Sequence, residues 1–119
     1  MGDEREGAAR PEDITRLFAE RAKAKDAEGL ASLYEDDAVL AYPPGQTTEG
    51  RAAIRALYEK MLERAPEFEP EEPLPSVVIG DLALTATVAK DEAVARAQVV
   101  RRQPDGTWLR ILDRPDFRG

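Results

Sequence analysis

The second half of the chain decides the fold; from residue 76 to residue 113 it reads SVVIGDLALTATVAKDEAVARAQVVRRQPDGTWLRILD. Four short apolar runs alternate there with turn sequences, a pattern typical of successive antiparallel strands. The runs cover residues 76–79, 82–89, 93–102 and 107–113. Gly80-Asp81 and the segment 103–106, Gln-Pro-Asp-Gly, are strong turn signals. This half therefore predicts an antiparallel meander.

The first half predicts helices instead. Pro11 suits a first helical position, and the acidic residues 12 and 13 favour the positive end of the helix dipole. One apolar face then recurs at helical spacing up to about Lys25. Its members are Ile14, Leu17, Phe18 and Ala22. Asp26 can cap a second, short helix that turns Leu30, Leu33 and Tyr34 inward.

A short strand and the clearest helix complete this half. Residues 38–42 form an apolar run that the turn sequence 43–45, Pro-Pro-Gly, ends. A helical stripe follows Gly50 and stops at Pro66. The stripe consists of Ile54, Leu57, Tyr58, Met61, Leu62 and Ala65. We expect the proline-rich segment 66–75 to be an extended lead-in or an edge.

Helices followed by strands predict an α+β domain in which three helices cover one face of a curved antiparallel sheet. Such a cone has one open end, which either fills with side chains or holds a small ligand. The 119 residues correspond to one domain. Residues 1–10 are small and charged and predict a disordered leader, so the single domain is expected over residues 11–119.

Composition excludes several function classes. The chain has no cysteine and no histidine, which removes thiolate and imidazole chemistry and thiolate metal sites. Neither a metal nor a cofactor is expected. The net charge of −7 argues against a nucleic-acid partner. Residues 93–119 are nevertheless basic, and their arginines either face water and acidic helices or form a positive lining for an anionic ligand.

The N-terminal sequence has no apolar segment of the kind that signal peptides carry, and no stretch approaches the length of a membrane helix. A cytoplasmic protein without a membrane partner is the expectation.

Three segments together resemble the nuclear transport factor 2-like superfamily, which includes ketosteroid isomerase and the SnoaL-like polyketide cyclases. They are residues 33–39, Leu-Tyr-Glu-Asp-Asp-Ala-Val, the Pro-Pro-Gly turn at 43–45, and residues 50–55, Gly-Arg-Ala-Ala-Ile-Arg. Segments 80–84 and 100–108, followed by Asp113, are similar to its small bacterial YybH-like branch. The resemblance implies this cone fold and a dimer formed through the sheet, but the fold hosts many functions.

The comparison with ketosteroid isomerase argues against that isomerisation. The resemblance places Tyr42 where the isomerase has its catalytic aspartate, Phe18 in place of its oxyanion tyrosine, and Gln98 in place of its protonated aspartate. A phenol has a reference pKa near ~10 and is a poor base at neutral pH. Phe18 donates no hydrogen bond, and Gln98 has no proton to transfer.

Asp113 and Tyr42 are the candidate catalytic residues. Strand alternation places Leu109, Ile111 and Asp113 on one face and Trp108 with Leu112 on the other, so Asp113 faces the cone if Leu109 does. There it is either a base made useful by desolvation or the partner of Arg110 or Arg114. Pocket-lining candidates are Phe18, Tyr42, Tyr58, Met61, Leu62, Gln98, Val100 and Ile111. Core packing is the alternative for most of them.

Two functions remain open. The first is binding of a small apolar or weakly anionic molecule, with cofactor-free proton transfer such as isomerisation, cyclisation or dehydration. The second is a non-catalytic homodimeric association or ligand-binding module. In that case Ala97 and Val99 on one strand and Trp108 and Leu112 on the next form the outer contact.

Overall fold

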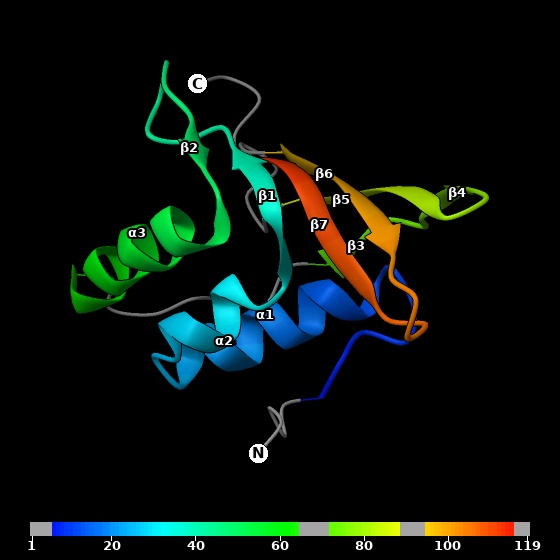
Figure 1. Cartoon of the computed structure of the whole chain (residues 1–119), viewed down its shortest axis with the longest axis horizontal. Coiled ribbons are helices and arrows are strands. Elements are labelled where there is room, and N and C mark those ends of the chain that lie inside the picture. The colour runs from blue at the N-terminus through cyan, green and yellow to red at the C-terminus, as the bar shows by residue number, and fades with distance from the viewer. Residues whose placement is uncertain (1–5, 65–71, 89–94, 116–119) are drawn as a thin grey trace.

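The computed structural model describes residues 6–64, 72–88 and 95–115 and shows three helices and one mixed sheet there (Figure 1). The helices are α1 (Asp13–Lys23), α2 (Ala27–Ala31) and α3 (Arg51–Arg64). The strands are β1 (Tyr34–Leu40), β2 (Thr48–Glu49), β3 (Glu72–Pro73), β4 (Val77–Ile79), β5 (Leu82–Val88), β6 (Ala95–Arg102) and β7 (Trp108–Arg114). The predicted α+β class and element order are confirmed.

The first two helices differ from expectation at the ends of α1 but not in their acidic starts. α1 begins at Asp13, so the expected place of Pro11 at the first helical position is wrong, and it ends at Lys23 rather than Lys25. α1 has Asp13 in its first turn and Arg21 and Lys23 in its last, which suits the helix dipole at both ends. The Asp26 carboxylate caps α2 by accepting a hydrogen bond from the Gly29 N–H at 3.0 Å. α1 and α2 lie side by side along one face of the sheet, and α3 packs near β1 (Figure 1).

The sheet has the strand order β2-β1-β7-β6-β5-β3, with β4 paired to β5. β4 to β7 pair antiparallel in chain order, as the meander predicts. β1 instead runs parallel to β7, which joins the two halves of the chain. Sequence patterns do not predict this pairing because its partners are about seventy residues apart.

β1 is longer than predicted, since it begins at Tyr34 and includes the acidic residues that were expected to precede the strand. Two of these acidic side chains have charged partners. Glu35 accepts a hydrogen bond from Arg101 Nε at 2.9 Å, and Asp36 lies 2.7 Å from Arg51 Nη1. Arg51 also donates to the Tyr34 carbonyl oxygen at 2.9 and 2.7 Å. These contacts let a polar segment remain extended at the sheet.

A bulge in β7 corrects the predicted alternation of that strand. Val99 pairs with Leu112 and the next residue, Val100, pairs with Arg110, so Ile111 is an extra residue on β7. Arg110 and Asp113 are therefore both buried, whereas simple alternation assigns them to opposite faces. The expectation that Leu109, Ile111 and Asp113 share one face is wrong. Asp113 does face inward, but through the bulge.

The same bulge separates Trp108 from Leu112, which were expected on one outer surface. Trp108 is buried in the core, whereas 51% of Leu112 is exposed. The outer face still carries a continuous apolar row across five strands. Its members pair in sequence as Val77–Leu84–Val99–Leu112–Val39. We call this set the outer row.

The structure describes residues 6–10 of the predicted leader. In residues 6–10, Ala8 is buried and its carbonyl oxygen accepts a hydrogen bond from the Trp108 N–H at 2.9 Å. We call residues 6–8 the N-terminal arm. It extends the packed structure beyond the domain start expected at residue 11, although residues 1–5 are outside the described residues.

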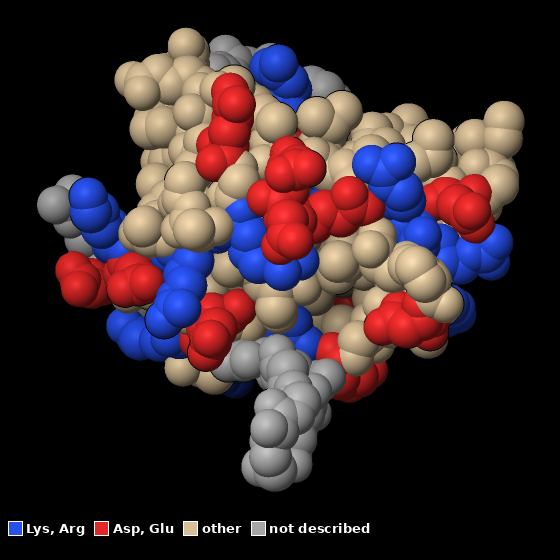
Figure 2. Space-filling model, in the orientation of Figure 1, with Lys and Arg blue, Asp and Glu red and all other residues tan. Residues whose placement is uncertain are grey.

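Among the described residues, none of the helices has the length and apolar character of a membrane-spanning segment. Basic and acidic side chains intermingle on the face drawn in Figure 2, so the charges there do not gather by sign. On this face, the basic character expected for residues 93–119 does not appear as a separate positive patch.

Candidate functional site

The interior of the cone contains a polar cluster made by Tyr34, Tyr58, Arg110 and Asp113. The Tyr34 hydroxyl donates to Asp113 Oδ2 at 2.6 Å and lies 2.8 Å from the Tyr58 hydroxyl. The Tyr34 hydroxyl has one proton and donates it to Asp113, so the Tyr58 hydroxyl donates to the Tyr34 oxygen. Arg110 Nη1 lies 3.3 Å from the Tyr34 hydroxyl and 3.4 Å from Asp113 Oδ2. This series of hydrogen bonds therefore ends at Oδ2 of Asp113.

Four elements supply this cluster and its cover. Tyr34 opens β1, Tyr58 lies on α3, and the arginine and aspartate lie on either side of the β7 bulge. Phe18 of α1 closes over the arginine, with its ring centroid 5.0 Å from the guanidinium carbon of Arg110. Phe18 and Tyr58 also meet edge to face at 5.6 Å. The cluster thus ties both halves of the chain together.

Burial determines the protonation of this cluster. It raises the pKa of Tyr34 and Tyr58 above the ordinary value of a phenol, and the negative charge of Asp113 raises both further. Burial by itself lowers the pKa of Arg110, but Asp113, Tyr34 and Tyr58 together outweigh this effect, and the resulting pKa is raised. At neutral pH both hydroxyls remain donors and the guanidinium remains charged.

Two buried atoms of the cluster have no hydrogen-bond partner, namely Asp113 Oδ1 and Arg110 Nε. One is an acceptor and the other a donor, and they belong to side chains that are 3% and 6% exposed. Buried polar groups are nearly always satisfied in proteins, so such a pair calls for an explanation. A bound group that both donates and accepts would satisfy the two atoms.

The other predicted site residues surround this cluster at different depths. Gln98 pairs directly with Asp113 across β6 and β7, and its Oε1 accepts from Thr85 Oγ1 at 2.8 Å. Val100 and Leu62 lie in the core. Phe18, Tyr42 and Met61 are only partly buried and pack against that core. Ile111 is the half-buried bulge residue.

Tyr42 is not part of the hydrogen-bonded cluster. It follows β1 and precedes the cis peptide bond to Pro43. Its hydrogen bonds among the described contacts are made by its backbone, where the N–H donates to the Leu40 carbonyl oxygen at 2.9 Å and the carbonyl oxygen accepts from Thr48 Oγ1 at 2.7 Å. Its predicted contact with a ligand stays a prediction.

The sequence analysis missed Tyr34 as a site residue and treated Arg110 only as an alternative partner of Asp113. Tyr34 was expected to turn inward as an ordinary core residue, and no local pattern pairs it with Asp113, 79 positions away. The bulge hides Arg110 because simple alternation turns it outward. An arginine in a strand indicates a buried polar site only when the strand register shows that the arginine faces inward.

The comparison with family models identifies the group. The model of the SnoaL-like domain matches residues 14–118, which is most of the chain. The chain belongs to the SnoaL-like domain family. This places it in the nuclear transport factor 2-like superfamily, as the sequence motifs imply, while assignment to the YybH-like branch stays a prediction. No protein of curated function matches the sequence significantly.

Solved structures show the same fold at low sequence identity. One is a candidate calcium/calmodulin-dependent protein kinase type II association domain from Thiobacillus denitrificans, with 20% identity, a TM-score of 0.73, and coverage of 93% of this chain and 98% of that one. A ketosteroid isomerase-like protein from Erwinia carotovora has 18% identity, a TM-score of 0.70 and coverage of 87% and 89%.

A candidate dehydratase of the nuclear transport factor 2-like family from Streptomyces avermitilis has 18% identity, a TM-score of 0.68 and coverage of 87% and 90%. These likenesses establish a cystatin-like, cone-shaped α+β fold for the SnoaL-like chain.

The buried ion pair makes a specific stability prediction. We expect Arg110→Met to lower the free energy of unfolding by about 3–5 kcal/mol, because it leaves the Asp113 carboxylate buried without its countercharge. The double variant Arg110→Met/Asp113→Leu should recover most of that loss. Urea unfolding measures both, and Arg114→Met, at an exposed position of the same strand, is the matched control. A double variant no more stable than Arg110→Met would contradict this account.

The raised pKa values of Tyr34 and Tyr58 predict alkaline destabilisation. An unfolded tyrosine loses its proton near pH ~10, whereas the folded chain retains both protons above that pH. Stability should therefore be constant below about pH 10 and fall above it by about 1.4 kcal/mol per pH unit for each tyrosine. Urea unfolding from pH 8 to 11.5 measures the slope. Tyr58→Phe should reduce it, and an unchanged slope would refute the assignment.

Proposed function

We propose that the chain binds a small molecule with an apolar body at the wide end of the cone and transfers a proton of that molecule through Asp113. The observation that carries this proposal is the unpartnered, buried oxygen Oδ1 of Asp113, next to an Oδ2 held by Tyr34. A carboxylate fixed through one oxygen is oriented to use the other, which is the geometry that a general base requires.

The two unpartnered atoms indicate the chemical character of the ligand. Its polar head donates to, or yields a proton to, Asp113 Oδ1, and it accepts from Arg110 Nε. Hydroxyl groups and the enol forms of ketones have this character. The half-buried apolar side chains of Phe18, Tyr42 and Met61 suit the body of the ligand, with the neighbouring Tyr58 and Leu62 behind them. Apolar walls with few convergent polar groups are typical of small-molecule sites.

The proton transfer balances without a cofactor. Asp113 Oδ1 takes the proton from the carbon next to a carbonyl group, the C–H electron pair forms the enolate double bond, and negative charge moves to the carbonyl oxygen. Arg110 Nε and the amide nitrogen of Gln98, whose oxygen is already bound by Thr85, are the donors that receive this charge. Return of the proton to another carbon completes an isomerisation.

The proposal also assigns roles to the remaining predicted site residues. Tyr42 contributes its hydroxyl at the mouth of the cone. Ile111 acts through the bulge that orients Asp113, and Val100 supports Arg110 from the opposite strand. The printed names of two structural neighbours, a ketosteroid isomerase-like protein and a candidate dehydratase, support chemistry of this class.

The test uses 2-tetralone, an apolar ketone with exchangeable α-protons. In heavy water we expect the wild-type chain to accelerate α-proton exchange over buffer, as measured by proton NMR, and Asp113→Asn to abolish this acceleration. Exposed Asp37→Asn on β1 is the matched control and should keep the full rate.

Binding is measured in parallel by amide chemical shifts. 2-Naphthol should bind about tenfold or more tightly than 2-methylnaphthalene, because a hydrogen bond to a charged group contributes about 1.5–3 kcal/mol. Binding without exchange would reduce the proposal to a non-catalytic binder. Absence of shifts at Phe18, Gln98 and Asp113 with all three compounds would overturn it.

A homodimer formed through the sheet is the second candidate, and the outer row supports it. Described residues of this row remain accessible, with 49% of Leu84 and 67% of Val77 exposed. Contiguous apolar surface of this kind marks an interaction site. A second copy presents the same row, so a two-fold axis brings apolar surface against apolar surface.

Leu112→Lys tests this dimer. It places a charge in the middle of the outer row and should convert a dimer into a monomer, as measured by analytical ultracentrifugation at micromolar concentration. Val78→Lys is the matched control, because Val78 is 54% exposed but pairs with Ala83 on the inner face. A wild-type chain that is already monomeric would reject the dimer.

A further inference from the structure

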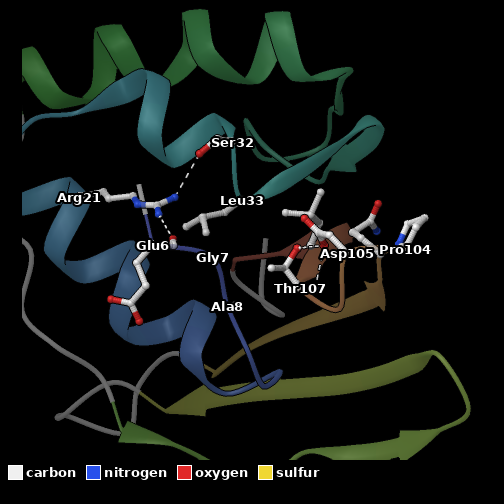
Figure 3. Close-up of a pocket in the computed structure, with 11 residues that line it drawn as sticks. Glu6, Gly7, Ala8, Arg21, Ser32, Leu33, Pro104, Asp105 and Thr107 are labelled. Atoms are coloured by element: carbon white, nitrogen blue, oxygen red, sulfur yellow. Dashed lines mark hydrogen bonds between the residues drawn. The ribbon is translucent and has the colours of Figure 1, made fainter. Parts of the chain in front are cut away.

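A groove of about 530 Å³ lies between the N-terminal arm and the turn that joins β6 to β7 (Figure 3). Its apolar lining comes from Ala8, Leu33, Pro104 and Leu109, and polar side chains stand around it. The volume falls in the range of ligand pockets, ~300–1,000 Å³. None of the residues proposed above for the cone lines this groove.

The groove arises because two different segments pair with one edge of β7. The Trp108 N–H donates to the Ala8 carbonyl oxygen in the arm, and the Arg110 N–H donates to the Leu33 carbonyl oxygen ahead of β1. These two partners come from opposite sides of α1 and α2 in the chain. The groove lies next to Leu109, between the arm and the segment before β1, because no single strand continues along this edge of β7.

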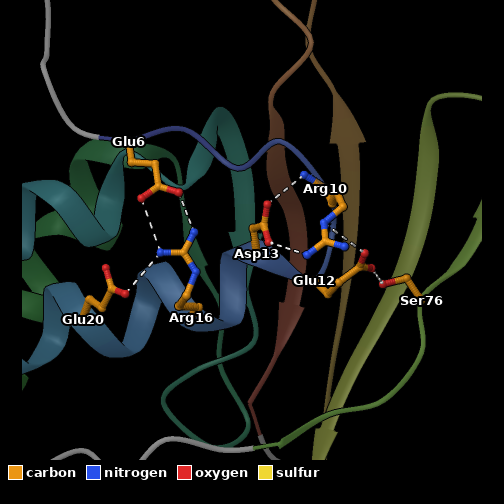
Figure 4. A network of polar contacts seen from close by, with 7 residues as sticks. All are labelled: Glu6, Arg10, Glu12, Asp13, Arg16, Glu20 and Ser76. Carbon is orange, nitrogen blue, oxygen red and sulfur yellow. Dashed lines mark hydrogen bonds and ion pairs between the residues drawn. The ribbon is translucent and has the colours of Figure 1, made fainter.

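The walls of the groove are held in place by the protein itself. On the arm side, the buried Arg21 donates to the Gly29 carbonyl oxygen at 2.9 Å, to Ser32 Oγ at 3.1 Å and to the Glu6 carbonyl oxygen. The Glu6 carboxylate binds Arg16, which also binds Glu20 at 3.1 Å (Figure 4). The arm is therefore fastened to α1 at both its backbone and its side chain.

The turn side is equally well defined. Asp105 Oδ1 accepts from the Thr107 N–H at 2.9 Å and from Thr107 Oγ1 at 2.6 Å. These hydrogen bonds lower the pKa of Asp105, so its carboxylate is charged at neutral pH. Gly106, with φ of 87°, closes the turn through a bond from its N–H to the Gln103 carbonyl oxygen at 2.8 Å. The groove is thus preformed.

The charged side chains at the groove indicate which kind of ligand it binds. Arg21 and Asp105 stand at opposite ends of the groove in Figure 3, and Arg21 donates hydrogen bonds to oxygen atoms of the protein itself. Asp105 has committed only Oδ1 to its turn, which leaves its other oxygen to face a ligand. We propose that this groove is a second binding site, for a small organic cation whose apolar body lies on Leu33 and Leu109 and whose charged head meets Asp105.

This site is independent of the cone. Leu109 and Asp113 are four residues apart on an extended strand, which corresponds to roughly 13 Å at ~3.3 Å per residue. The negative net charge of the chain, −7, also favours association with cations over anions. The proposal does not rest on any activity of Asp113.

The probe is benzyltrimethylammonium, titrated into the isotopically labelled chain and followed by amide chemical shifts. We expect saturable shifts at Gly7, Ala8, Leu33 and Thr107. Asp105→Asn keeps an oxygen for the Thr107 hydrogen bonds but removes the charge, so the turn persists while Kd rises about threefold. Asp37→Asn should leave Kd unchanged, and high salt should weaken binding to the wild type.

Three results would overturn the proposal. The first is the absence of saturable shifts at the groove. The second is equal binding of uncharged benzyl alcohol, which would show that charge does not select the occupant. The third is an unchanged Kd in Asp105→Asn, with retained Thr107 chemical shifts showing that the turn is intact.

Discussion

The ion pair between Arg110 and Asp113 is the constraint on which the interior of this domain depends. Taking two charges almost completely out of water is costly, so this pair depends on the groups that surround it. Tyr34 supplies a hydroxyl to the carboxylate, and Phe18 covers the guanidinium. Because those side chains come from β1 and α1, the two charges determine how the helical half of the chain sits on the sheet.

The single extra residue in β7 determines which side chains form that pair. With Ile111 inserted opposite β6, Arg110 and Asp113 both point inward although they are three positions apart. The same insertion turns Leu112 outward, where it completes the outer row across the sheet. One local irregularity thus produces both the polar cluster inside and the apolar surface outside. The two candidate functions, ligand binding and self-association, use opposite faces of the same strand and are compatible with each other.

The two ends of β7 differ in character for a related reason. Near Asp113 the strand is paired on both sides, and polar groups are buried with two atoms unsatisfied. Near Leu109 one edge is shared between the arm and the segment before β1, which leaves a groove with apolar walls and a charged rim. The first environment favours a ligand that exchanges hydrogen bonds deep in the cone. The second favours a ligand attracted by charge at the surface.

Much of the fold is predictable from the sequence, because helices, caps and hairpins are specified by residues that are close in the chain. The helical stripes, the Asp26 cap and the turns at Gly80 and Gly106 follow from such local patterns. The sequence left the inward position of Asp113 conditional on the orientation of Leu109, and the structure reaches it through the bulge instead. Tertiary structure alone decided the parallel pairing of β1 with β7, the bulge, and the meeting of Tyr34 with Asp113. These features join distant segments, and their energies depend on burial and register, which no local pattern of residues encodes.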